Sequence, residues 1–138
     1  MKDVKLGCKI IAVLIFLTLL VNFSIVVVPI KLIYYMRASD GFGIVYVIMG
    51  LIFLLSNLFA AISLFRTRRF GFGAAYAAIV FSTFVFGVSY LPFFDKLFPA
   101  KYAPFAALVA NIGILTLLIS LQMMTFEPRK KLKPKRKK

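Results

Sequence analysis

The chain reads IIAVLIFLTLLVNFSIVVVPI from Ile10 to Ile30, an apolar stretch without a charged residue. Three more uncharged stretches follow it, at Gly41–Phe65, Phe70–Phe94 and Tyr102–Phe126. Each stretch is 21 to 25 residues long. At about 1.5 Å per residue, helices of this size would be roughly 30–38 Å long. Because the hydrocarbon core of a bilayer is about 30 Å thick, the pattern predicts four transmembrane helices.

Little of the chain is left outside these stretches. Of the 138 residues, 62% are hydrophobic, which predicts one transmembrane domain at 1–126 followed by a tail at 127–138. The connections at 66–69 and 95–101 are too short to let the helices they join separate, so each should join an antiparallel pair. The sequence therefore predicts an all-α integral membrane four-helix bundle with up-down-up-down topology.

Lysine and arginine are distributed unevenly among the predicted connections. If the N-terminus is cytoplasmic, 14 of the 18 basic residues lie inside, within 2–9, 66–69 and 129–138, and 4 lie outside. Short loops rich in Lys and Arg stay in the cytoplasm. This asymmetry predicts that the N-terminus is cytoplasmic. An even number of spans places the C-terminus on the same side, so both termini are expected in the cytoplasm.

Small residues predict which helices pack closely. In lipid, helices associate through faces of Gly, Ala and Ser that let their backbones approach. The third and fourth predicted helices are rich in Gly and Ala, so we expect them to form the most closely packed pair. The first predicted helix has no small face between Ile10 and Val21. We expect that helix to be more exposed to lipid or to a partner.

Three asparagines lie within the predicted spans. Asn22 and Asn111 are each eight or nine residues from the outer end of their helix, or about 12–14 Å deep, so they could meet. Asn57 lies deeper, on the second helix. One interpretation is structural, with the amides forming hydrogen bonds between helices. The alternative is a polar path for a solute or a contact with another subunit.

Aromatic residues gather near the predicted outer boundary. Tyr and Phe at this depth are typical of an interfacial belt that anchors helices in the bilayer. A lipid or quinone pocket among them is the alternative. The residues are Tyr34, Tyr35, Phe42, Tyr46, Tyr90, Phe93, Phe94, Phe98, Tyr102 and Phe105.

The groups that usually perform chemistry are scarce in this sequence. It contains no histidine and one cysteine, so the chain has no His ligand or His base, and it cannot form a Cys-only metal site by itself. Its four acids, Asp3, Asp40, Asp95 and Glu127, lie at or beyond the ends of the spans. The composition predicts a protein that is not an enzyme and that binds no metal or cofactor.

The tail is strongly basic. Charges just inside the membrane are attracted to anionic headgroups by about 1 kcal/mol each, so we expect anionic lipids as partners. The tail has too few apolar residues to fold by itself and lacks aromatics that could stack on bases. We therefore expect a disordered segment without a specific nucleic-acid partner. The expected lipid contacts are Arg129, Lys130, Lys131, Lys133, Lys135, Arg136, Lys137 and Lys138.

These features favour a small non-catalytic membrane protein, in the bacterial inner (plasma) membrane, that serves as an accessory or scaffold subunit of a larger assembly. Other membrane protein subunits would then be its partners. Two alternatives remain open at this stage. One is a transporter of small molecules or lipids that works as a homo-oligomer, and the other is a lipid- or quinone-contacting subunit of a membrane enzyme.

Overall fold

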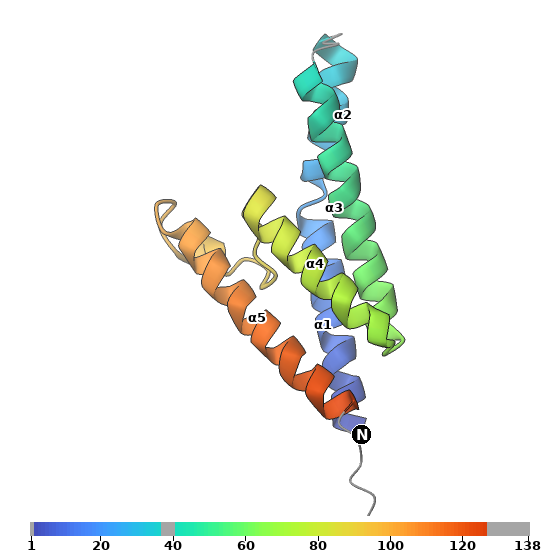
Figure 1. Cartoon of the computed structure of the whole chain (residues 1–138). Coiled ribbons are helices and arrows are strands. Elements are labelled where there is room, and N and C mark those ends of the chain that lie inside the picture. The colour runs from blue at the N-terminus through green and yellow to red at the C-terminus, as the bar shows by residue number, and fades with distance from the viewer. Residues whose placement is uncertain (1, 37–40, 127–138) are drawn as a thin grey trace, which may run out of the picture.

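The computed structural model describes residues 2–36 and 41–126, and all regular structure in them is helical (Figure 1). The expected lipid contacts of the tail lie outside the described residues. One short 3₁₀ turn, η1, precedes the last helix. The α-helices are α1 (Lys2–Val21), α2 (Ser24–Met36), α3 (Gly41–Phe65), α4 (Arg69–Phe86) and α5 (Ala103–Phe126), and η1 is Asp95–Leu97.

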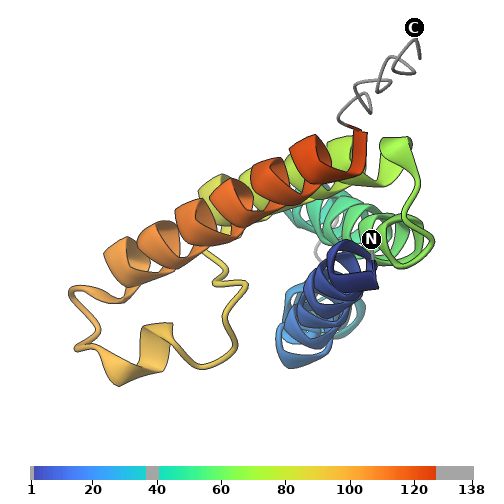
Figure 2. The ribbon, with the colours of Figure 1, turned by 90° about the horizontal axis from the view of Figure 1, so that it is seen from below.

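Helices α1 and α2 follow one another along one side of α3, while α4 and α5 lie on another side (Figures 1 and 2). In the described part of the chain, the most extensive contact joins α3 and α4. The contact between α4 and α5 is much smaller, so the expectation that these two helices pack most closely is wrong. The small residues of α4 serve mainly to bring it against α3.

Gly71 shows why α3 and α4 can approach so closely. A Cβ atom built on Gly71 would lie only 2.7 Å from the backbone carbonyl carbon of Ser63, at the end of α3. Real Cβ atoms do not come this near to a neighbouring backbone, so only glycine fits without a shift. Next to it, Phe72 is fully buried, and Gly73 has open space around it.

Helix α1 buries one face of large aliphatic side chains. Cys8, Ile11 and Ile15 are fully buried, and Ala12 and Leu19 nearly so. The helix packs along α3 and also contacts α5. Its large aliphatic side chains fill the space between helices, which a search for small residues could not detect. Leu6, Phe16 and Leu20 on its other face are exposed, so the expectation of greater exposure to lipid or to a partner stays a prediction.

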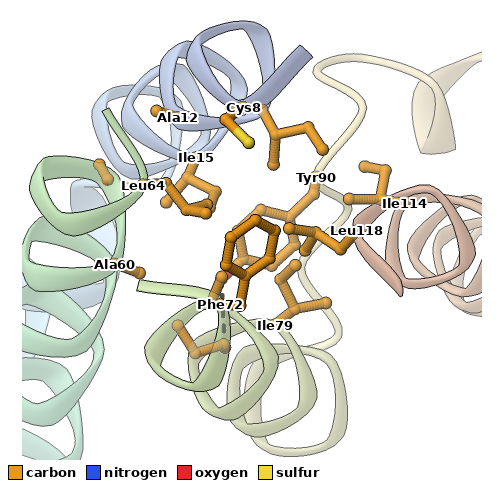
Figure 3. Packing of buried hydrophobic residues seen from close by; sticks show 14 of the residues in the cluster. Cys8, Ala12, Ile15, Ala60, Leu64, Phe72, Ile79, Tyr90, Ile114 and Leu118 are labelled. Carbon is orange, nitrogen blue, oxygen red and sulfur yellow. Dashed lines mark hydrogen bonds between the residues drawn. The ribbon is translucent and has the colours of Figure 1, made fainter. Parts of the chain in front are cut away.

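The core receives side chains from four helices and from one segment that is not helical. Figure 3 shows Ile15 of α1, Leu64 of α3, Phe72 of α4 and Leu118 of α5 around a common centre. The ring of Tyr90, which follows α4, lies among them. A phenol in this position needs partners for its hydroxyl, because an unpaired polar group is costly in an apolar interior.

The first predicted span is broken in two. Helix α1 ends at Val21, and a turn at Asn22 and Phe23 leads into α2. The Asn22 amide donates to the Thr18 carbonyl at 2.9 Å, a local bond that competes with regular helix. The continuous helix expected over 10–30 is therefore wrong, and the break lies inside the apolar stretch.

Pro29 lies inside α2. Proline has no N–H, so the carbonyl four residues earlier, that of Ile25, loses its helical donor. Gly50 of α3 lies against this carbonyl, and a Cβ on Gly50 would be 3.0 Å from the Ile25 oxygen. A glycine here lets the α3 backbone, with its weakly polar Cα–H groups, approach the freed oxygen.

Helix α4 stops eight residues before the predicted end of its span at Phe94. Gly87 adopts the left-handed conformation (φ 62°, ψ 26°), and its N–H donates to the Thr83 carbonyl at 3.0 Å. The Gly87 bond is the 5→1 bond of an αL cap, and the Val88 N–H also donates to the Ser82 carbonyl at 3.3 Å. The span predicted at 70–94 is therefore too long, because an apolar sequence continues past a backbone stop.

Four segments of the described chain are long and apolar enough to cross a membrane: Asp3–Lys31, Gly43–Phe65, Arg69–Phe86 and Ala103–Phe126. The first of them contains the break between α1 and α2. Large apolar side chains, such as Val13, Leu55 and Phe84, are exposed on their outer faces. Such surfaces are unfavourable in water and suit a lipid environment, which indicates a membrane protein.

Candidate functional site

Tyr90 connects the segment after α4 to the interior of the helices. Its hydroxyl donates to the Asn57 Oδ1 of α3 at 2.5 Å and lies 2.9 Å from the Ser82 Oγ of α4. The Asn57 Nδ2 donates to the Phe53 carbonyl at 2.8 Å. Tyr90, Asn57 and Ser82 are all fully buried. They form a closed polar cluster in which each group has a partner.

Asn111 of α5 holds the chain where it leaves α4. Its Nδ2 donates to the Val88 carbonyl at 2.7 Å and to the Thr83 Oγ1 at 2.8 Å. Its Oδ1 accepts the backbone N–H of Tyr90 at 2.8 Å. One side chain thus replaces the helical partners of two backbone groups. Non-helical backbone at membrane depth requires such partners when it is buried in protein.

The structure does not bring Asn22 and Asn111 together. The Asn22 amide bonds to its own helix, whereas Asn111 bonds to the segment after α4 and to α4 itself. Asn57 and Asn111 both make hydrogen bonds between elements, through Tyr90 and Val88. Asn57 and Asn111 thus lie in structural contacts, and Asn22 borders a pocket.

Sequence reasoning missed the role of Tyr90. We placed this residue in an interfacial aromatic belt, and the structure buries it completely, so that assignment is wrong. The available signal was local: Gly87 and Pro92 bracket the segment, and both are typical of a helix end. The apolar residues between them hid that signal in a hydropathy pattern.

A polar pocket of about 400 Å³ lies between the α1–α2 break and the segment that follows α4. Its polar lining residues are Thr18, Asn22, Ser24, Ser89 and Lys96. Nothing in the sequence indicates that Ser89 and Lys96 lie beside the first span. They reach it because α4 ends early and the chain turns back.

Two other pockets are apolar. One has a volume of about 310 Å³ and is lined by residues of the predicted aromatic belt: Phe94, Phe98, Tyr102 and Phe105. A second pocket, of about 400 Å³, lies between α1 and α3, with Phe16 in its wall and Arg66 at its edge. Both have the composition of surfaces that contact hydrocarbon chains. Among the described residues, no group of three His, Cys, Asp or Glu side chains is placed to hold a metal ion.

The fold and this site define a class: a helical membrane protein in which Tyr90, Asn57 and Asn111 are paired across elements. Beyond the class, the chain matches no protein-family model, no curated protein and no solved structure.

Proposed function

We propose that this chain is a small non-catalytic accessory or scaffold subunit of a larger assembly in the bacterial inner membrane. Its four spans run up-down-up-down, with both termini and the Arg66–Arg69 turn in the cytoplasm. The uneven distribution of basic residues supports this orientation. The basic tail would then lie against anionic lipid of the inner leaflet.

The observation that carries the proposal is an apolar arm formed by α2 and residues 41–50 of α3. In Figure 1 this α2–α3 arm extends well beyond the ends of α4 and α5. Helix α2 has extended contact with α3 alone among the described helices. Val28, Ile44 and Ile48 are each about half exposed on the arm. The described part of the chain therefore leaves much of this apolar surface uncovered.

When one part of a membrane protein extends further along the bilayer normal than another part, matching both to the same bilayer costs free energy. If the outer boundary of the hydrocarbon lies at the level of Lys96 and Lys101, the tip of the α2–α3 arm projects beyond it. Mismatch between apolar length and bilayer thickness is relieved by bilayer deformation or by association with other helices. Apolar helices of a partner subunit would cover the arm without deforming the bilayer.

Site-specific photo-cross-linking in native membranes tests the accessory role. A photoreactive amino acid at Ile44 on the arm should give a stoichiometric cross-link to another membrane protein. Leu117 on α5 has the same exposed fraction, 50%, and is the matched control. We expect that position to cross-link mainly to lipid. Lipid adducts alone at both positions would contradict the proposal.

A second candidate is a transporter of lipids or small molecules that works as a homo-oligomer. The polar pocket beside a broken helix favours it, because transporter sites are often formed by interrupted spans. Cross-links from Ile44 only to other copies of the chain would support this candidate against the accessory role. The third, a lipid- or quinone-contacting enzyme subunit, has the aromatic pocket at Phe94 and Phe98 in its favour.

A further inference from the structure

The polar pocket between the α1–α2 break and the segment after α4 has a lining unlike the rest of the transmembrane surface. Five polar residues border it: Thr18, Ser24 and Ser89, which carry hydroxyl groups, Asn22, which carries an amide, and Lys96, which carries an ammonium group. At about 400 Å³, it is within the usual range for small-ligand sites, roughly 300–1,000 Å³.

Thr18 gives independent support for a ligand. Its side chain is fully buried, and its Oγ1 has no hydrogen-bond partner among the described residues. The hydroxyls of Thr83, Thr116 and Thr125 behave differently, since each donates to the carbonyl four residues back in its own helix. An unpaired buried hydroxyl costs free energy that a bound acceptor would recover. Thr18 is also among the residues that line the pocket.

The charge of the lining indicates which acceptor fits. Lys96 is exposed, and its Nζ lies 5.0 Å from the centre of the Phe93 ring, which also borders the pocket. Among the described lining residues there is no Asp or Glu. An ammonium group together with hydroxyl and amide donors suits an oxyanion, because charge-assisted hydrogen bonds are stronger than neutral ones.

We propose that this pocket binds a phosphate group, with Lys96 as its cation and Thr18 as a buried donor. The group belongs to the headgroup of an anionic phospholipid or to a soluble phosphate ester. Apolar residues also border the pocket, among them Val21, Ile25 and Phe86, and they suit an attached acyl chain. The proposal does not depend on the accessory role.

Calorimetric titration of the full-length protein in a neutral detergent tests this site. One probe is dihexanoyl phosphatidylglycerol and the other is glycerol 3-phosphate, in about 0.5 M salt, where the Debye length of roughly 4 Å weakens binding by the basic tail. Lys96→Gln should reduce affinity about tenfold, and Thr18→Val about fivefold, as expected for one charged and one neutral hydrogen bond.

Lys101→Gln is the matched control. Lys101 follows Lys96 in the same connection and also lies over an aromatic ring, 5.8 Å from the centre of Tyr102, but it does not line the pocket. The affinity of the Lys101→Gln variant should stay within about twofold of that of the unmodified protein, because Lys101 does not border the pocket. Binding of the phospholipid alone identifies a lipid site, and binding of glycerol phosphate alone identifies a soluble ester. Failure of both probes to bind, or equal losses in the two lysine variants, would overturn the proposal.

Discussion

Gly71→Ala is expected to lower the free energy of unfolding by about 2–3 kcal/mol, near the upper end for overpacking of a close contact. The added methyl group would lie 2.7 Å from the Ser63 carbonyl carbon and 2.8 Å from the Leu64 nitrogen. Both atoms belong to backbone, which cannot move aside as a side chain can. Helices α3 and α4 would have to separate along their most extensive contact.

Gly73→Ala is the control for this prediction. It introduces the same methyl group two residues further along α4, where no atom lies within 4 Å apart from its chain neighbours and the backbone of its own helix. Its effect should be neutral or stabilising by up to about 1 kcal/mol, because alanine is the better helix former. Titration with dodecyl sulfate from maltoside micelles, followed by far-ultraviolet circular dichroism, measures both values. Equal unfolding free energies would mean that α3 and α4 do not meet at Gly71.

Asn111→Leu is expected to cost about 2–4 kcal/mol, since it leaves two buried backbone groups without partners. The Val88 carbonyl would lose a donor at 2.7 Å, and the Tyr90 N–H would lose an acceptor at 2.8 Å. Leucine has the same branched arrangement of heavy atoms as asparagine but a larger volume, so part of the cost comes from packing. The same micelle titration provides the measurement.

Asn22→Leu removes an equivalent amide from another span and serves as the comparison. Within residues 2–36 and 41–126, the Asn22 side chain donates only to the Thr18 carbonyl, which already accepts the Asn22 backbone N–H at 3.0 Å. Its loss leaves no backbone group unpaired, and we expect less than about 1 kcal/mol. If the two variants are equally destabilised, Asn111 does not hold the segment after α4.

Hydropathy predicts the long helices well where charge marks their ends. Helix α3 has the bounds of the predicted stretch, Gly41–Phe65, and α5 begins one residue later than predicted. Both segments meet charged or turn-forming residues at their ends. In such segments the uncharged stretch and the helix have nearly the same first and last residues.

The same pattern fails where a helix ends inside apolar sequence. Residues 88–94 are uncharged, so nothing in hydropathy separates them from α4. Their backbone is held by Asn111, which lies more than 20 residues further along the chain. Such a partner cannot be identified from local sequence. The break at Asn22 was hidden in the same way, although the asparagine itself was noticed.

The candidate sites were predictable only as single residues. Polar residues in apolar spans stand out in a sequence, and Asn57 and Asn111 were identified for that reason. Their partner Tyr90 looked like an anchor at the membrane boundary, because its position depends on where α4 ends. The polar pocket depends on the same event, since it brings Ser89 and Lys96 beside Thr18. One misplaced helix end therefore concealed both features.

The central claim is that the chain leaves α4 at Phe86 and returns the Tyr90 side chain to the interior, against Asn57. A double-mutant cycle with Tyr90→Phe and Asn57→Leu tests it most directly, through the unfolding free energies of the three variants and the unmodified protein. We expect a coupling energy of about 1 kcal/mol or more, as for residues in one hydrogen-bond network. Tyr76→Phe is the control, because the Tyr76 hydroxyl donates to the Gln122 Oε1 at 2.6 Å and makes no bond to Asn57. Its cycle with Asn57→Leu should show coupling below about 0.5 kcal/mol. Additive effects of Tyr90→Phe and Asn57→Leu would contradict the claim and would favour a helix that continues to Phe94.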